Sequence, residues 1–239
     1  MKKYDVHIHT YHSKCSGNTK LKRILKKAKQ KGLSGIAVTD HNTIKGALEL
    51  KRLNKDKDFK IIVGEEIKTD VGHVLAYYLK KEIKPGKLSR VIKDIKKQKA
   101  IGVLAHPFNY PHPVKQATAV IAKLIGIKHK RASVNLTPEN VKLVKKLDAI
   151  EGFNSRCMLK KENKDAQKLA SKFNLPVIAG SDGHFLWELG NAYVKFEDEL
   201  SLRQAIKKRE LRIKGRHSNF ILVKICIALN LIKKLLIRG

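Results

Sequence analysis

Two histidines near the start of the chain have the spacing of a metal site. They lie in the segment Asp5-Val-His7-Ile-His9, at alternate positions of a short apolar stretch. In a strand, alternate side chains point to the same face, so His7 and His9 would lie side by side. Neutral imidazole nitrogens are good ligands for zinc, manganese or iron. The pair therefore predicts a divalent metal site, and the alternative is two ordinary hydrogen-bonded histidines.

Outside that pair, candidate ligands stand where predicted strands end or begin. Those at strand ends are His41, Glu66, His106, Glu151, Asp182 and His184, and His73 stands at a strand start. In barrels of alternating strands and helices, active sites form at the C-terminal ends of the strands. We therefore expect these side chains to gather at one rim of the fold.

The elements that would position these residues are short apolar strands alternating with amphipathic helices. The strands are predicted at residues 4–8, 35–39, 60–63, 73–79, 101–105, 149–153, 176–179 and 190–196. The helices are predicted at residues 21–31, 44–53, 88–99, 114–128, 138–147, 159–173 and 200–210. This alternation is typical of a parallel α/β architecture. A chain of 239 residues needs only one such domain, which we place at residues 1–215.

The net charge is +31, from 52 Lys+Arg against 21 Asp+Glu. Such a charge attracts polyanions and favours a nucleic-acid partner bound through a basic surface. Much of it, however, lies on helix faces such as residues 20–31 and 93–99, which is typical of a solvated surface, and lysine enrichment also fits a hyperthermophile. With 6% aromatic residues, no stretch interleaves aromatic and basic side chains as a stacking platform would. Charge alone therefore leaves the polyanionic partner open.

Cysteine usage and the N-terminus indicate a cytoplasmic location. Cys15, Cys157 and Cys226 are scattered and form neither a disulfide framework nor a paired metal-binding motif. Met1-Lys-Lys3 leads directly into a short strand, without the apolar segment of a signal peptide. We therefore expect a reducing compartment.

The last segment, residues 216–239, differs in character from the rest. Its residues 220–239 are mostly apolar but carry Lys224, Lys233, Lys234 and Arg238, which interrupt a membrane-spanning run. We expect a basic, apolar C-terminal helix packed on the barrel. The alternatives are a peripheral helix on an anionic membrane and an oligomer contact, and the oligomeric state stays open.

Taken in series, six short motifs resemble the PHP (polymerase and histidinol phosphatase) family of metal-dependent phosphoesterases. They are His7-x-His9, Thr39-Asp-His41, Gly64-x-Glu66, Gly72-His-Val-Leu-Ala-Tyr77, Ala105-His-Pro107 and Gly180-Ser-Asp-x-His184. The resemblance runs from residue 4 to about residue 195. It implies a distorted seven-stranded (β/α) TIM-like barrel that holds two to three divalent ions.

The resemblance also implies which residues bind each ion. The first ion would be bound by His7, His9 and Asp182, with Glu66 bridging it to a second ion that His73 and His106 complete. The third site would use His41 and His184 with a residue from the loop after His9. Family members usually have Asp or His in that loop, whereas this chain has Cys15, with His12 as a substitute. A thiolate would favour zinc or iron there.

Clustered cations of this kind bind phosphate oxygens and lower the pKa of water to ~7, so that hydroxide can attack phosphorus. We therefore predict a manganese-, zinc- or iron-dependent phosphoesterase that acts on nucleotide-like or small phosphorylated substrates. One alternative is an exonuclease that trims oligonucleotides or RNA. The other is a non-catalytic nucleic-acid-binding barrel, against which the near-complete ligand set argues.

Catalytic and orienting roles can be assigned as well. Glu66 and Asp182 are the predicted catalytic carboxylates, with Glu65 the alternative if the register shifts by one residue. Arg156 would bind a substrate phosphate as a third catalytic residue, or is a surface arginine in a loop. Asp40 and Asp5 would orient ligating histidines, and for Asp5 a structural hydrogen bond is an equal alternative.

Overall fold

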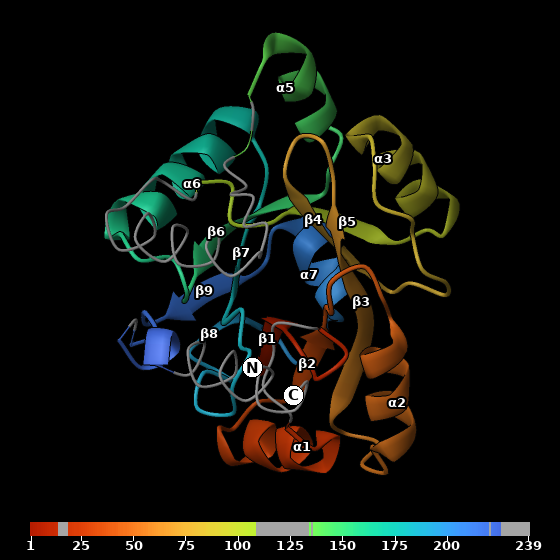
Figure 1. The fold of residues 1–239 in the computed structure, drawn as a ribbon, viewed down its shortest axis with the longest axis vertical. Helices are drawn as coiled ribbons and strands as arrows, with labels where there is room; N and C mark the ends of the chain where they lie inside the picture. Colours follow the sequence, from red (N-terminus) through yellow and green to blue (C-terminus); the bar gives the residue numbers. More distant parts are fainter. Residues whose placement is uncertain (14–18, 109–133, 135, 220, 226–239) are drawn as a thin grey trace, which may run out of the picture.

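The computed structural model describes residues 1–13, 19–108, 134, 136–219 and 221–225. Its centre is a nine-stranded sheet in the order β7-β6-β5-β4-β3-β2-β1-β8-β9 (Figure 1). The strands are β1 (Lys2–Ile8), β2 (Gly35–Val38), β3 (Lys60–Lys68), β4 (His73–Tyr77), β5 (Ile101–Leu104), β6 (Ala149–Asn154), β7 (Val177–Gly180), β8 (Ala192–Phe196) and β9 (Arg212–Gly215). The helices are α1 (Leu21–Gln30), α2 (Lys45–Leu53), α3 (Leu88–Lys97), α5 (Pro138–Val144), α6 (Lys160–Phe173) and α7 (Leu202–Lys208).

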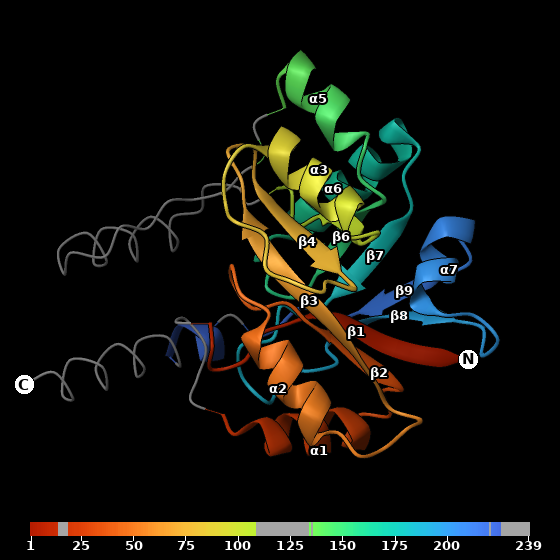
Figure 2. The same ribbon diagram turned by 90° about the vertical axis from the view of Figure 1, so that its right-hand side faces the viewer.

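The central strands are apolar on both faces, and both faces are therefore buried. Alternate residues of one strand enter two different cores, as with Ala37 and Val38 in β2 or Ile62 and Val63 in β3. One core lies between the strands and the helices α1, α2, α3 and α6, and the other includes the apolar side of α7. Figures 1 and 2 show α1 and α2 against β1–β3, and α3, α5 and α6 at the opposite end against β4–β7.

The predicted seven-stranded parallel barrel is wrong in strand number and in direction. The sheet has nine strands, and it is parallel only within β1–β2–β3 and β5–β6–β7. β4 is antiparallel to both of its neighbours because the short turn Thr69–Gly72, rather than a crossover helix, joins it to β3. This reversal brings His73, the first residue of β4, opposite Lys68 at the end of β3. The start of β4 thereby reaches the same rim as the ends of the parallel strands.

β8 extends the sheet beyond β1 and is antiparallel to it, and β9 is in turn antiparallel to β8. β8 was predicted from the sequence but β9 was not, since Arg212–Gly215 has four residues, is mostly exposed and lacks an apolar run. The helices were predicted within a few residues of their observed bounds, except the one at residues 114–128, which lies outside the described residues.

The two halves of the sheet meet where β1 approaches the chain that follows β7. Ile8 forms a parallel bridge with Gly183, in which His9 N–H donates to Gly183 O (2.9 Å) and Gly183 N–H donates to His7 O (3.3 Å). A Cβ atom on Gly180 would lie 2.3 Å from the Cβ of His7, so only glycine permits this approach. These contacts nearly close the sheet into a barrel.

At the C-terminus the structure describes a short helical stretch at residues 221–225. The remainder of the predicted C-terminal helix, residue 220 and residues 226–239, lies outside the described residues, so that expectation stays a prediction. Within the described ranges, none of the helices has the length and hydropathy needed to cross a membrane.

Candidate metal centre

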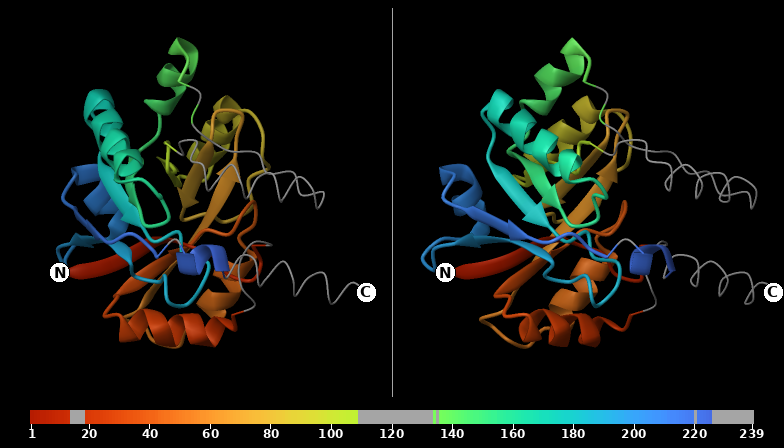
Figure 3. Two further views of the ribbon diagram at one scale, coloured as in Figure 1. Left: turned by 60° about the vertical axis from the view of Figure 1, so that its left-hand side comes forward. Right: turned by 90° about the vertical axis from the view of Figure 1, so that its left-hand side faces the viewer.

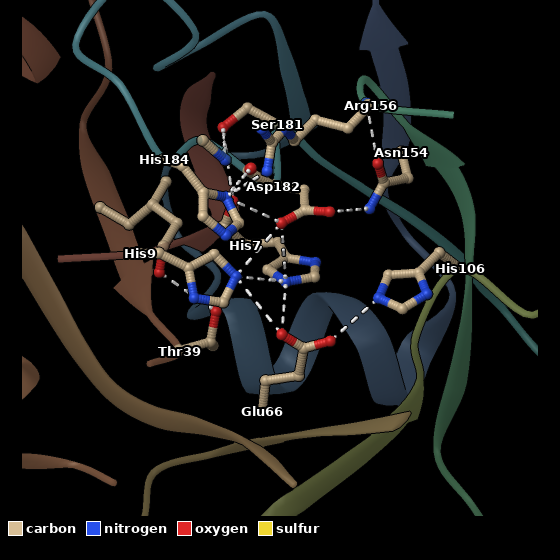
Figure 4. A network of polar contacts seen from close by, with 12 residues as sticks. His7, His9, Thr39, Glu66, His106, Asn154, Arg156, Ser181, Asp182 and His184 are labelled. Atoms are coloured by element: carbon tan, nitrogen blue, oxygen red, sulfur yellow. Dashed lines mark hydrogen bonds and ion pairs between the residues drawn. The ribbon is translucent and has the colours of Figure 1, made fainter. Parts of the chain in front are cut away.

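Glu66 stands at the centre of a ring of imidazoles. Its side chain is 1% exposed, and it projects from the end of β3 (Figure 4). Its Oε1 atom lies 2.7 Å from Nδ1 of His73 and 2.9 Å from Nε2 of His106. Its Oε2 atom lies 2.8 Å from Nδ1 of His41, 3.4 Å from Nε2 of His9 and 3.6 Å from Nε2 of His7. One carboxylate thus connects histidines from four strands or their adjoining loops.

Asp182 supplies a second carboxylate to the same cluster. Its Oδ1 atom lies 3.2 Å from Nε2 of His9, 3.6 Å from Nε2 of His7 and 3.4 Å from Nδ1 of His184. The backbone of Asp182 has a φ of +53°, a left-handed conformation that aspartate adopts more readily than most residues. This turn directs the carboxylate from the end of β7 toward the histidines of β1.

The surrounding histidines hold the carboxylates of Glu66 and Asp182 in their ionised form. Burial raises the pKa of Glu66, but His41 and His73 more than offset this and hold that pKa well below its ordinary value. Burial likewise raises the pKa of Asp182, while His7 and His9 bring it well below the ordinary value. Two anionic oxygen ligands are therefore available among the imidazoles.

Ligand atoms converge in four overlapping groups whose atoms all lie within 4.8 Å of one another. These groups are His7, His9 and Glu66; Glu66, His73 and His106; His9, His41 and His184; and His7, His106 and Asp182. The first two contain residues expected at the first and second sites. The third brings His41 and His184 together as expected, but with His9 as their neighbour, and the expected Cys15 lies outside the described residues.

Glu151 determines which nitrogen of His7 faces the cluster. Its Oε1 atom lies 2.8 Å from Nδ1 of His7, so this nitrogen donates a hydrogen bond and Nε2 of the neutral ring presents a lone pair. The Oε2 atom of Glu151 accepts hydrogen bonds from the backbone N–H of His106 (2.9 Å) and from Nδ2 of Asn154 (3.1 Å). Glu151 therefore orients a ligand of the cluster from behind.

His9 is oriented by a similar chain through Ser13. The Ser13 hydroxyl donates its only proton to Oδ1 of Asp40 (2.7 Å). Its Oγ atom therefore accepts a hydrogen bond from Nδ1 of His9 (3.0 Å). Asp40 thus acts on His9 through Ser13. Asp5 instead accepts backbone N–H groups of Ser181 (3.0 Å) and Gly190 (2.8 Å), in agreement with the structural alternative.

The donor set fits divalent cations. With hydrogens on Nδ1 of His7 and His9, their Nε2 atoms face each other 3.1 Å apart. Two lone pairs at this separation repel unless a proton or a metal cation lies beside them. Burial lowers the pKa of His7, but Glu151 and Asp182 raise it well above the ordinary value, so a proton is attracted to this position. Mixed imidazole and carboxylate ligands suit manganese, iron or zinc.

Arg156 lies in the loop after β6 and is not the surface arginine of the alternative reading. Its side chain is 15% exposed, with Nε 3.1 Å from Oε1 of Glu188 and Nη1 2.7 Å from Nδ1 of His184. Oε2 of Glu188 accepts the backbone N–H groups of His184 (3.0 Å) and Phe185 (3.1 Å). Glu188 does not stand at the end of a strand, so its sequence position gives no sign of this role.

Glu65, the alternative to Glu66, faces away from the cluster. Its Oε2 atom accepts the backbone N–H of Ile83 (2.9 Å), as the two-residue period of β3 requires when Glu66 faces inward. His12, the substitute considered for the third site, binds Glu49 through Nε2 (3.0 Å).

Comparisons with known proteins agree on one kind of domain. A family model described as PHP-associated matches residues 160–211. An uncharacterised protein of Methanocaldococcus jannaschii is 33% identical over 198 residues, which cover 82% of this chain and 71% of that protein. The DNA polymerase III subunit alpha of Aquifex aeolicus is 25% identical over 209 residues, which cover 76% of this chain and 18% of the subunit.

Two solved structures share the fold. PsfC from Pseudomonas syringae PB-5123 superposes with a TM-score of 0.62 at 17% identity, covering 96% of this chain and 97% of PsfC. The lesion-specific endonuclease PfuEndoQ from Pyrococcus furiosus superposes with a TM-score of 0.56 at 15% identity, covering 89% of this chain and 57% of the endonuclease.

Proposed function

The chain belongs to the PHP-domain family, and from this premise we propose that it is a metal-dependent hydrolase of phosphate esters. The observation that carries the proposal is the convergence of six imidazoles and two carboxylates at one rim of the barrel-like sheet. Its members are His7, His9, His41, His73, His106, His184, Glu66 and Asp182. Histidines with purely structural roles would each form a hydrogen bond with a different partner. In this cluster, the ring nitrogens of six histidines share the same two carboxylates.

Two or three divalent ions would be bound by these residues. His7, His9 and Asp182 would bind one, His73 and His106 a second, and Glu66 would connect the two, while His41 and His184 border a third position. Manganese, iron or zinc bound there would neutralise phosphate charge and make a water molecule acidic enough to act as a nucleophile near neutral pH.

The chain's own residues prepare this centre. Glu151 and the Ser13–Asp40 pair fix the rings of His7 and His9, so their lone pairs need no reorientation when an ion arrives. Arg156 is a cation that is not itself a candidate ligand, and its contact with His184 places its guanidinium beside the cluster. A phosphate oxygen at the cluster would meet that guanidinium, which favours substrate orientation through paired N–H donors.

The similarity to DNA polymerase III subunit alpha and to an endonuclease supports a substrate of nucleotide type. A hydrolase of small phosphate esters and an exonuclease both fit the centre. The non-catalytic binding barrel fits less well, because selection for binding alone would not require orienting partners behind the histidines.

The test is hydrolysis, with manganese and with EDTA, of a phosphomonoester, a bis-phosphodiester, a 3′,5′-bisphosphonucleotide and a short 5′-phosphorylated RNA. The control is the double variant His7→Ala/His9→Ala, with metal content measured on both proteins. We expect manganese-dependent product from at least one substrate and none from the control. A metal-free protein that hydrolyses nothing would overturn the proposal.

A further inference from the structure

A groove of about 470 Å³ lies between α1 and the loop that follows β7. It is lined by Arg23, Lys26, Lys27 and Gln30 of α1 and by Leu186 and Trp187 of the loop. The four α1 residues have the spacing i, i+3, i+4 and i+7, so they share one side of the helix. In Figures 1 and 3 the loop after β7, drawn in cyan, reaches α1. Residues some 160 positions apart thus form one surface.

The cations of this groove lack anionic partners within the part of the chain that the structure describes. The ion pairs found there include none with Arg23, Lys26 or Lys27, whereas Lys29 on the neighbouring side of α1 pairs with Asp56 at 2.6 Å. Three positive side chains therefore face the groove without neutralisation. Such a surface attracts a ligand that carries several negative charges.

Trp187 gives the groove an aromatic wall. It is the one tryptophan of the sequence and is partly exposed. Its ring lies within 4° of parallel to that of Phe185, with ring centroids 6.4 Å apart. A partly exposed indole beside unpaired cations is the combination that binds a nucleobase and its phosphates in single strands.

The groove and the metal centre share one loop, because Trp187 and His184 are close in sequence. Trp187 follows His184 by three residues, a distance of at most about 10 Å of extended backbone. Glu188 holds the backbone N–H groups of His184 and Phe185, and its other oxygen binds Arg156. The loop that carries Trp187 is therefore tied to the cluster at its beginning.

We propose that this groove binds a nucleotide of a single-stranded oligonucleotide whose scissile phosphate lies at the metal centre. The inference rests on the proposed function and names its substrate class. A small phosphate ester would place its one phosphate at the metal centre and leave the groove's three cations unused. In a duplex the base faces are stacked, so Trp187 would have no free surface to contact.

The test is binding of a short oligo(dA) strand to the whole protein in EDTA, where no metal-dependent cleavage takes place. Trp187 is itself the reporter, because stacking of a base on indole quenches its fluorescence, and anisotropy of a fluorescein-labelled strand measures total binding. Two double variants are compared: Lys26→Glu/Lys27→Glu in the groove and Lys93→Glu/Lys96→Glu on α3, which makes the same change in net charge on another helix.

We expect saturable quenching by oligo(dA) and none by an abasic strand of equal charge. Lys26→Glu/Lys27→Glu should weaken binding and lower the slope of log affinity against log salt by about 1.4, for two lost contacts with a single strand. Lys93→Glu/Lys96→Glu should change the affinity and the salt slope much less. Trp187→Ala should weaken binding of oligo(dA) about fivefold or more, and leave the abasic strand unaffected.

Equal weakening by the two double variants would overturn the inference, since the strand would then sense only net charge. Binding without quenching would also overturn it. These outcomes are separate from failure of the proposed function, because the assay needs neither metal nor hydrolysis. A protein that cleaves phosphomonoesters but fails the quenching test keeps the proposed function and loses the groove.

Discussion

Oε1 of Glu151, on β6, lies 2.8 Å from Nδ1 of His7, on β1, and this contact determines which ring nitrogen of His7 faces the metal centre. Glu151→Gln keeps an acceptor for that N–H but removes the negative charge that makes the imidazole more basic. We expect manganese affinity to fall about 10–100-fold with the fold retained. Competition with a chromophoric chelator measures this. Unchanged affinity would show that Glu151 does not support His7 as a ligand.

Glu66→Gln should remove bound metal and activity together, since Glu66 contacts five of the six imidazoles. The neighbouring Glu65→Gln is the matched control, because its side chain faces Ile83 on the other side of β3. Elemental analysis and initial rates should distinguish the two proteins clearly. If both variants keep their metal, the assignment of Glu66 as the bridging ligand is wrong.

Glu65 also predicts a pH-dependent stability. Burial raises its pKa to about 7, although the N–H of Ile83 partly offsets this. The folded protein therefore holds this proton more tightly than the unfolded chain. The stability that it contributes is complete below the ordinary pKa of 4.5 and is lost as pH rises to about 7.

Glu65→Gln should accordingly raise the melting temperature above neutral pH, with a gain that shrinks as the pH is lowered below the ordinary glutamate pKa. Thermal unfolding across this range measures it, with the exposed Glu199→Gln as control. A difference that does not vary with pH would contradict the account.

Metal removal should lower the melting temperature, because cations bind the folded cluster and not the dispersed ligands. At a metal concentration 100 times the dissociation constant, the expected stabilisation is about 2.7 kcal/mol. In His7→Ala/His9→Ala the melting temperature should respond much less to manganese. A response equal to that of the unaltered protein would place the stabilising ion elsewhere.

Arg156 should affect substrate binding more than metal binding. Arg156→Ala removes the guanidinium beside His184, so inorganic phosphate should inhibit less strongly and KM should rise about tenfold or more, while metal content stays unchanged. Arg156→Lys keeps the charge without the paired donors and should recover only part of the loss. Unchanged phosphate inhibition in both variants would assign Arg156 a purely structural role with Glu188.

The residues of the candidate metal centre could be singled out because each stands in a short motif beside an apolar strand. His7, Glu66 and Asp182 are each recognisable locally, and strand order then brings them together. The direction of β4 depends on a short turn, which the general alternation of strands and helices does not reveal. β9 has no apolar run because most of its residues are exposed.

What the sequence could not show depends on contacts between distant segments. Arg156 and Glu188 belong to different loops, and their pairing becomes visible only when β6 and β7 lie side by side. Likewise, no single stretch of the sequence interleaves aromatic and basic residues, since Trp187 and the cations of α1 come from distant parts of the chain. Local patterns identify individual residues, but they do not determine which surfaces the fold assembles.

The bridge between Ile8 and Gly183 also affects the order in which this protein folds during and after synthesis. Joining these residues closes a loop of most of the chain, so the seam is a contact of very long range and is expected to form late in folding. A nascent chain that ends before Asp182 and His184 has made the other ligands but cannot complete the centre. An ion held by these residues would therefore be bound only after most of synthesis is over, and it would then slow reopening of the seam.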